Sequence, residues 1–155
     1  MKKNNVTRLL DQRKISYEVF ELPEEKLGAL ESARLLGVSP EKVFKTIVVN
    51  RIKPGKAILA VVPGNSEVDL KRLAKALGEK KLKLATQKEA EQMTGLETGG
   101  ISPLALIKRG FQVVIDSSAN DYDEIHISGG QRGLNIRLSS AALGKLVGAR
   151  YAEIG

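Results

Sequence analysis

The sequence has 155 residues and no cysteine, and hydrophobic residues make up 42% of it. This length fits one domain spanning residues 1–155, with enough apolar residues to bury a core. Without cysteine the chain cannot form a disulfide, a cysteine-ligated zinc site or a thiol nucleophile, which fits a reducing cytoplasm. The net charge of +7 predicts an anionic partner, nucleic acid first, although a charge that serves only solubility explains it equally well.

A membrane partner is not expected. The chain has no run of about 18 apolar residues, the length that a transmembrane helix needs. The start at Met1 is basic, but Arg8, Asp11 and Arg13 interrupt the apolar positions that follow, which argues against a signal peptide.

The first half of the chain is expected to alternate helices and strands. Periodicity predicts a helix over 5–13, a strand over 15–19, a helix over 27–36 ended by Gly37, and a hairpin of strands 43–51 and 57–62. Just before that hairpin, Ser39-Pro40 is typical of a helix start, with an N-cap residue followed by a proline in the first turn.

The second half begins with helices and ends with strands. The pattern predicts a helix capped by Asp69 and closed by Gly78, a strand over 82–84, a helix with a capping box at Thr86 and Glu89, a glycine-rich loop over 95–103, strands over 111–115, 124–128 and 134–138, and a helix over 139–147. This order has no strict βαβ rhythm. It predicts an α+β fold with a mixed, partly barrel-like sheet surrounded by helices.

Lys45 lies near the start of the otherwise apolar segment 43–49. A lysine that points outward from a strand costs no free energy, and this structural interpretation has about the same weight as a functional one. A lysine that points inward needs an anionic or carbonyl partner. A bound substrate could be that partner, because lysine acts as a point charge for a phosphate or a developing oxyanion.

Two glycine-rich segments, 98–103 and 128–133, are candidate anion-binding loops. Adjacent glycines let a ligand approach the backbone, and successive N–H groups can form a nest for an anion. The alternatives are an ordinary connection for the first segment and a hairpin turn for the second. Neither matches a phosphate-binding or dinucleotide-binding motif, so no cofactor is expected. If the loops converge in space, Lys108, Arg109 and Arg132 bring positive charge with them.

The chain has one histidine, His126, in the expected strand 124–128. A single histidine cannot form a two-histidine metal motif, and no nearby residues supply a catalytic triad order. A structural, hydrogen-bonded His126 is therefore favoured, and no metal is expected.

At these motifs the sequence resembles the YbaK-type Cys-tRNA(Pro) deacylases, relatives of the editing domain of bacterial prolyl-tRNA synthetases. The resemblance rests on residues 43–46, 99–104 and 128–134, with further similarity at 14–16, 69–71 and 74–78. It implies the family fold and hydrolysis of the ester that joins cysteine to tRNA(Pro), and it extends to Cys-tRNA(Cys). It also implies a mechanism without cofactor or protein nucleophile, in which the substrate thiol attacks its own ester carbonyl.

The resemblance places Lys45 at the key lysine of the family, and we expect the Gly100 N–H to donate to the developing oxyanion. The expected substrate-binding residues are Phe20, Thr46, Gly99, Ile101, Ser102, Pro103, Ser128, Gly129, Gly130, Arg132 and Asn135. Two departures stand out: Asn135 replaces a frequent aspartate, and the segment 20–28 is shorter, with Phe20 in place of a pocket aromatic. The implied partners are the acceptor end of aminoacyl-tRNA and prolyl-tRNA synthetase.

Three alternatives stay open. The chain could be a deacylase for another mischarged tRNA, such as Ala-tRNA(Pro). It could be a non-catalytic module that binds tRNA or a synthetase, for which the charge of +7 is the motive. Its glycine loops could instead bind a small anionic metabolite.

Overall fold

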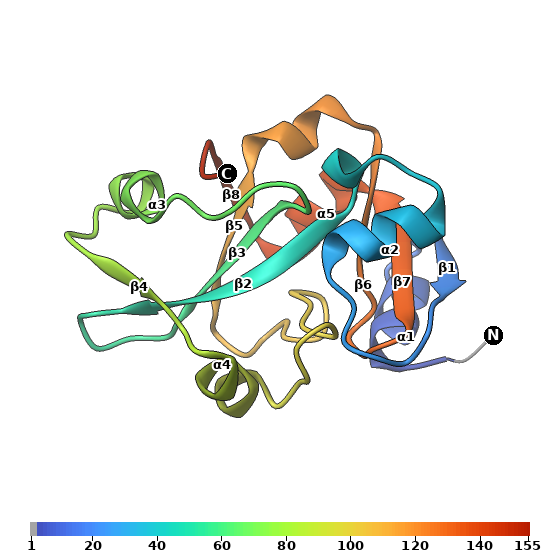
Figure 1. Ribbon diagram of the computed structural model, residues 1–155, viewed down its shortest axis with the longest axis horizontal. Coiled ribbons are helices and arrows are strands. Elements are labelled where there is room, and N and C mark those ends of the chain that lie inside the picture. Colours follow the sequence, from blue (N-terminus) through green and yellow to red (C-terminus); the bar gives the residue numbers. More distant parts are fainter. Residues whose placement is uncertain (1–2) are drawn as a thin grey trace.

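The computed structural model describes residues 3–155, so Met1 and Lys2 of the basic start lie outside it. Its strands form one three-stranded antiparallel sheet and one five-stranded mixed sheet (Figure 1). The smaller sheet has the order β1-β7-β6, with strands Tyr17–Glu21, Leu134–Ser139 and Glu124–Ser128. The larger sheet has the order β4-β2-β3-β5-β8, with strands Leu82–Leu84, Phe44–Arg51, Ile58–Pro63, Gln112–Asp116 and Arg150–Ala152.

Short helices surround these sheets. They are α1 (Asn5–Gln12), α2 (Ala29–Leu36), α3 (Leu70–Leu77), α4 (Gln87–Thr94) and α5 (Ser140–Val147), with 3-10 turns η1 (Pro40–Lys42) and η2 (Ser117–Asp121). In Figure 1, α1 and α2 lie beside the smaller sheet, and α3 and α4 lie on either side of β4. The expected side-chain caps at Asp69, Thr86 and Ser139 are present. Each accepts the backbone N–H three residues ahead, which a new helix leaves unpaired.

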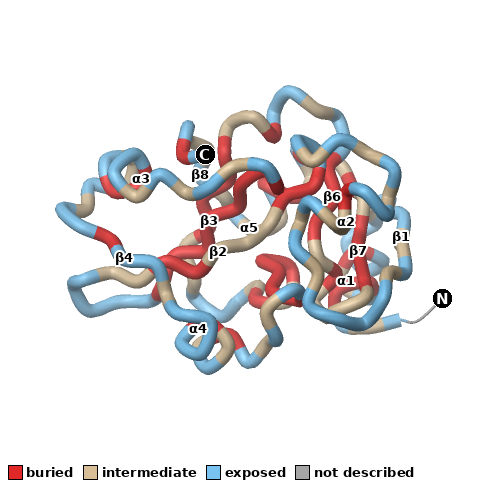
Figure 2. The backbone as a smooth tube through the Cα atoms, in the orientation of Figure 1, coloured by how far each residue is buried: buried red, intermediate tan, exposed pale blue. Residues whose placement is uncertain are grey.

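The main core lies between the two sheets. Buried residues concentrate along β2, β3, β6 and β7 (Figure 2). Strands β6 and β7 contribute alternate residues to this core, namely Ile125, Ile127, Ile136 and Leu138. Because neighbouring strand residues point to opposite faces, His126, Ser128 and Asn135 must share the other face. That face reaches the candidate site. A second core packs α3, through Leu73, against the far side of the larger sheet.

The two sheets meet at a single parallel bridge between Val43, just before β2, and His126 of β6. The predicted α+β fold with a mixed sheet is confirmed. Within residues 3–155 the strand ladders do not close into a barrel, because one bridge pair is all that joins the sheets. The β2–β3 hairpin is also confirmed, whereas the short strand β8 was not expected. No helix in residues 3–155 has the length and hydropathy needed to cross a membrane.

Candidate functional site

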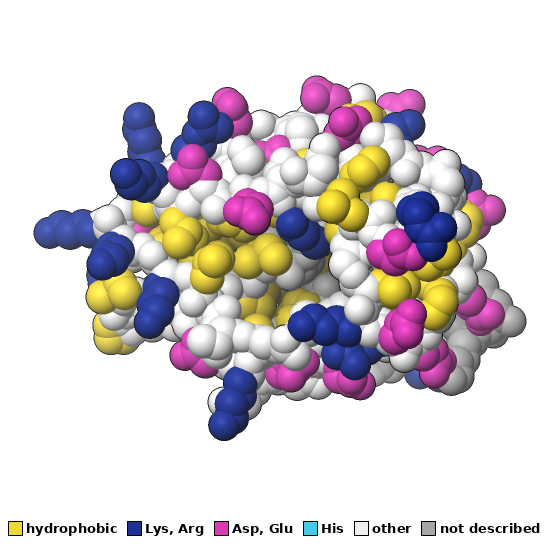
Figure 3. Space-filling view, in the orientation of Figure 1, with side chains coloured by type: hydrophobic (Ala, Val, Ile, Leu, Met, Phe, Trp, Pro, Cys, Tyr) yellow, Lys and Arg dark blue, Asp and Glu magenta, His cyan; other side chains and the backbone are white. Residues whose placement is uncertain are grey.

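A cavity of about 280 Å³ opens where the start of β2 meets the end of the β6–β7 hairpin. Figure 3 shows the hollow near the centre of this face, beside a basic side chain and a band of hydrophobic side chains. Its lining contains polar, charged and apolar residues. They come from four separate segments: Leu22, Glu25, Lys26, Leu27, Gly28, Ala29, Ser32; Val43, Phe44, Lys45, Thr46, Ile47; Thr98, Gly99, Ile101; and Ser128, Gly133, Leu134, Asn135.

The two glycine-rich segments do converge in space. A Cβ added to Gly100 would lie 2.8 Å from Gln131 Cα and 2.9 Å from Arg132 N, so the two backbones are in direct contact. Arg132 strengthens this junction, since its Nε donates to the Thr98 carbonyl at 2.7 Å and its guanidinium lies 3.0 Å from the Glu97 carboxylate. Arg132 therefore ties the loops together, and its charge is already partnered.

The segment between β1 and α2 forms the third wall. The Leu22 N–H donates to the Gly133 carbonyl at 2.8 Å, which anchors this segment on the hairpin loop. Lys26 reaches across to α4 and donates to Gln87 at 2.7 Å. Gly133 has a φ of +84°, and a Cβ there would lie 2.9 Å from the Leu22 carbonyl oxygen. A glycine is thus required both by the left-handed backbone and by the close approach.

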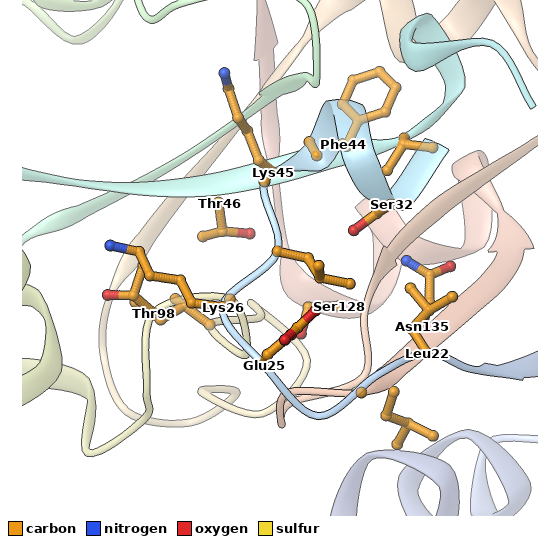
Figure 4. Close-up of a pocket in the computed structure, with 18 of the residues that line it drawn as sticks. Leu22, Glu25, Lys26, Ser32, Phe44, Lys45, Thr46, Thr98, Ser128 and Asn135 are labelled. Carbon is orange, nitrogen blue, oxygen red and sulfur yellow. The ribbon is translucent and has the colours of Figure 1, made fainter. Parts of the chain in front are cut away.

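Lys45 lines the cavity from β2, but its ammonium is turned to the rim. Nζ donates to the Gly64 carbonyl at 3.3 Å. Figure 4 shows the side chain pointing away from Ser128 and Asn135. The neighbouring Thr46 points to the opposite side of the strand, toward Lys26 and Thr98. The Gly64 carbonyl is the hydrogen-bond partner that the half-buried ammonium needs. After a rotamer change of the flexible lysine side chain, the ammonium could bind an anion instead.

Behind the cavity wall, His126 and Asn135 form a buried pair. They are 3% and 6% exposed, and His126 Nδ1 lies 2.8 Å from Asn135 Oδ1. Burial lowers the pKa of His126, while the hydrogen bond to Asn135 opposes that shift. His126 is thus buried and hydrogen-bonded, as expected. Asn135 also reaches the cavity, and Ser128 lines it beside Asn135.

The structure brings only some of the predicted site residues to the cavity lining. Those that line it are Lys45, Thr46, Gly99, Ile101, Ser128 and Asn135. Those that do not are Phe20, Gly100, Ser102, Pro103, Gly129, Gly130 and Arg132. Ser102 is fully buried, and its Oγ accepts the Leu104 N–H at 3.2 Å, so it supports the turn of the loop. Gly129 and Gly130 form the β6–β7 hairpin turn, as the alternative for this segment proposed.

Two expected site residues make contacts elsewhere in this structure. The Gly100 N–H donates to the Glu97 carbonyl at 2.8 Å, so the turn of the loop uses the group expected to face an oxyanion. Phe20 packs away from the cavity, with its ring 5.3 Å from His126 and beneath the guanidinium of Arg137. Within residues 3–155, no hydrogen bond engages the backbone N–H groups of Gly99 and Ile101, which both line the cavity.

The sequence interpretation missed most of the third wall. Glu25 is the one carboxylate among the lining residues, and Ser32 adds a hydroxyl from α2. Residues 22–26 show no regular periodicity, and the periodicity over 27–36 predicts a helix but not a cavity wall, so no local signal marks this segment as part of the site. Only the anchoring of Leu22 on Gly133, a contact across more than a hundred residues, places it at the cavity.

The site is built from loop backbone, hydroxyls and cations rather than from a nucleophile with its base. Its hydroxyl groups come from Ser32, Thr46, Thr98 and Ser128, while the one histidine lies behind the wall. Within residues 3–155, no group of three or more His, Asp or Glu side chains is arranged to hold a metal ion. The fold is α+β, and its pocket combines these polar groups with apolar side chains such as Leu22, Phe44 and Leu134.

Residues 24–146 match the family model of the aminoacyl-tRNA editing domain. The chain belongs to this family, as its YbaK-type motifs led us to expect, and it is an aminoacyl-tRNA editing hydrolase. Its substrate class is therefore mischarged aminoacyl-tRNA.

Two relatives and two solved structures show what the chain is similar to. The chain is 38% identical, over 98% of its length and 93% of the relative's, to EbsC of Enterococcus faecalis, named "Putative Cys-tRNA(Pro)/Cys-tRNA(Cys) deacylase". It is 31% identical over 82% of its length to the proline–tRNA ligase of Trichlorobacter lovleyi, of which it spans 23%. The crystal structure of a "putative trans-editing enzyme for prolyl tRNA synthetase" superposes with a TM-score of 0.80 at 26% identity, covering 99% of this chain and 98% of that one. The hypothetical protein APE2540 shares the fold, with a TM-score of 0.88 at 24% identity over 97% and 99% of the two chains.

Proposed function

We propose that this protein removes cysteine from Cys-tRNA(Pro), and also from Cys-tRNA(Cys), as a trans-editing enzyme. The observation that carries the proposal is the similarity to EbsC along almost the whole of both chains. The cavity agrees in size, since about 280 Å³ suits an aminoacyl group and excludes most of a tRNA.

The lining favours chemistry in which the substrate supplies the nucleophile. The cysteine sulfur attacks its own ester carbonyl, the C–O bond to the ribose breaks, and the ribose oxygen leaves with a proton. The four-membered thiolactone that forms is then opened by water to free cysteine. An intramolecular attack depends mainly on orientation, which contributes up to about 7–11 kcal/mol. The close walls of the cavity would provide that orientation.

Lys45 would stabilise negative charge in this reaction. Its ammonium can leave the Gly64 carbonyl for the phosphate of the terminal adenosine or for the leaving ribose oxygen. The N–H groups of Gly99 and Ile101 replace that of Gly100 as our candidates for the oxyanion donors.

A basic surface at the end of the larger sheet would hold the tRNA acceptor end. It consists of exposed lysines on and after α3 and on β4: Lys71, Lys75, Lys80, Lys81 and Lys83. None of these forms an ion pair within residues 3–155, whereas nearby Glu79 pairs with Arg51 and Lys53. Figure 3 shows basic side chains gathered at this end of the molecule. Unpaired lysines match a phosphate backbone and carry little sequence information. We therefore propose that prolyl-tRNA synthetase supplies tRNA selectivity, and that the enzyme acts in the cytoplasm, where tRNA is charged.

The test is single-turnover deacylation of Cys-, Ser- and Ala-charged tRNA(Pro) by the wild type, by Lys45→Ala and by Lys145→Ala. Lys145 is exposed on α5 and does not line the cavity, so it is the matched control. We expect loss of cysteine only, abolished in Lys45→Ala and unchanged in Lys145→Ala. Loss of alanine instead would require attack by water and would contradict the thiol mechanism. No loss of any amino acid would contradict the proposed specificity altogether.

A further inference from the structure

One face of the smaller sheet carries a continuous row of polar side chains behind the cavity. Ser128 and Asn135 are register partners at the cavity end of β6 and β7. His126 and Arg137 are the next pair along the same face, and Phe20 of β1 pairs with Asn135. The row therefore connects a cavity residue, Asn135, to a buried histidine that does not itself line the cavity.

The contact between His126 and Asn135 has a defined direction. An amide oxygen can only accept a hydrogen bond, so the imidazole nitrogen 2.8 Å from Asn135 Oδ1 must carry a proton. The Asn135 oxygen is thereby turned toward His126, and its NH₂ group is turned the other way. Figure 4 shows the Asn135 nitrogen on the side facing Ser32, across the cavity. No hydrogen bond within residues 3–155 engages this NH₂ group.

The imidazole is itself held in place. His126 is 3% exposed, its ring lies 5.3 Å from that of Phe20, and its backbone forms the bridge to Val43. Burial lowers the pKa of His126, and so does the charge of Arg137, whereas Asn135 and the carboxylates of Glu124 and Glu18 act in the opposite direction. The net shift is downward, which favours a neutral ring, and the Asn135 oxygen places its one proton on the facing nitrogen.

We propose that His126 is a positioning residue that fixes the Asn135 amide with its NH₂ group toward the cavity, where it donates to an acceptor oxygen of the aminoacyl ester. This inference rests on the proposed deacylase function. An aspartate at the same position would present an acceptor and a negative charge. The carboxylate of Glu25 is the one acid in the lining and is the group available to the substrate's ammonium.

The orientation can be measured without substrate, because the chain has a single histidine. A long-range ¹H–¹⁵N NMR spectrum of the imidazole reports directly which ring nitrogen carries the proton. We expect the neutral form with the proton on Nδ1 at pH 7, and a pKa below the ordinary histidine value. A proton on Nε2 would overturn the inference, since the Asn135 oxygen would then have no donor in His126.

The functional consequence is tested by three variants with a control. His126→Phe keeps a ring beside Phe20 but removes the donor, whereas His126→Gln keeps a donor in reach of Asn135. We expect kcat/KM for Cys-tRNA(Pro) to fall roughly tenfold or more in His126→Phe and in Asn135→Asp, and to be largely restored in His126→Gln. Asn120→Asp adds the same charge at an exposed position outside the cavity and should leave kcat/KM unchanged.

Thermal unfolding of each variant separates a lost hydrogen bond from a lost fold. If the folded His126→Phe and Asn135→Asp variants keep the wild-type kcat/KM, this inference is wrong and the proposed function stands. If the wild type deacylates none of the charged tRNAs, the proposed function is wrong, and the NMR spectrum still decides whether His126 fixes the amide. Raised His126 pKa in Asn135→Asp would further support the pairing, because a carboxylate stabilises the protonated ring.

Discussion

Replacing Gly100 with alanine places a methyl group inside the junction of the two glycine loops. The new Cβ would lie 2.8 Å from Gln131 Cα, 2.9 Å from Gln131 C and 2.9 Å from Arg132 N. Non-bonded carbon atoms prefer about 3.5–4.0 Å, so one backbone must retreat by more than half an ångström. Overpacking of this kind costs about 1–3 kcal/mol. For a chain of this size that cost corresponds to a fall in Tm of roughly 2–12 °C.

The same shift should move the cavity wall, because Gly99 and Ile101 flank Gly100 and both line the cavity. We expect kcat/KM for Cys-tRNA(Pro) to fall further than the lost stability alone explains, at a temperature where the variant stays folded. Calorimetry and single-turnover deacylation measure the two effects. Gly28→Ala is the control for a steric clash, since its φ of −72° is ordinary and nothing lies within 4 Å of its added Cβ; only the weaker N-cap preference of alanine should lower its stability. Wild-type Tm and activity in Gly100→Ala would refute the proposed contact between the loops.

Three further predictions concern stability. Asp69→Ala removes the cap that accepts the Arg72 N–H at 3.1 Å and should cost about 1 kcal/mol in urea unfolding; an unchanged midpoint would contradict the capping role. Arg51→Met leaves the nearly buried Glu79 without its 2.8 Å partner and should cost about 3 kcal/mol, whereas Lys53→Met, at 3.9 Å and exposed, should cost little. Burial raises the pKa of Asp116, but hydrogen bonds from Ser118 and from the N–H groups of Ile154 and Gly155 outweigh burial and lower it overall. Because the folded pKa lies below the unfolded value, this stabilisation is complete above about pH 4 and is lost as the pH falls through the folded pKa. Asp116→Asn should therefore flatten the acid limb of the stability–pH curve, and an identical curve would exclude this contribution.

Local sequence signals predicted most of the helices and strands, because the residues that begin, end and pattern each element lie within or next to it in the sequence. The cap at Asp69 and the left-handed glycines at Gly37 and Gly78 mark helix ends with residue types that the backbone requires there. The alternation in 124–128 and 134–138 likewise predicted both strands of the hairpin. Strand β8 escaped because Arg150–Ala152 lacks the apolar–polar–apolar pattern that marked the equally short Leu82–Leu84, and it is held by parallel pairing with β5.

Site residues were predictable from the sequence only where the residue type was itself unusual for its surroundings. Lys45 stood out as a charge in an apolar strand, and the paired glycines marked the loops that converge. Phe20 was misplaced because strand alternation sets its face but not the distance from that face to the cavity. The direction of the Gly100 N–H depends on a turn closed by Glu97, a hydrogen bond that residue type does not reveal.

The pairing of β1 with β7 joins Tyr17 to Leu138, and the cavity draws its walls from Leu22 through Asn135. A growing chain on the ribosome therefore cannot complete this pocket until residue 135 has been made. The hairpin that carries Ser128 and Asn135 must be synthesised before the segment that begins at Leu22 can form its hydrogen bond to Gly133. Such distant partners make for slow folding, with strand edges exposed meanwhile. Proofreading by this protein therefore waits until β7 has been made and has paired with β1.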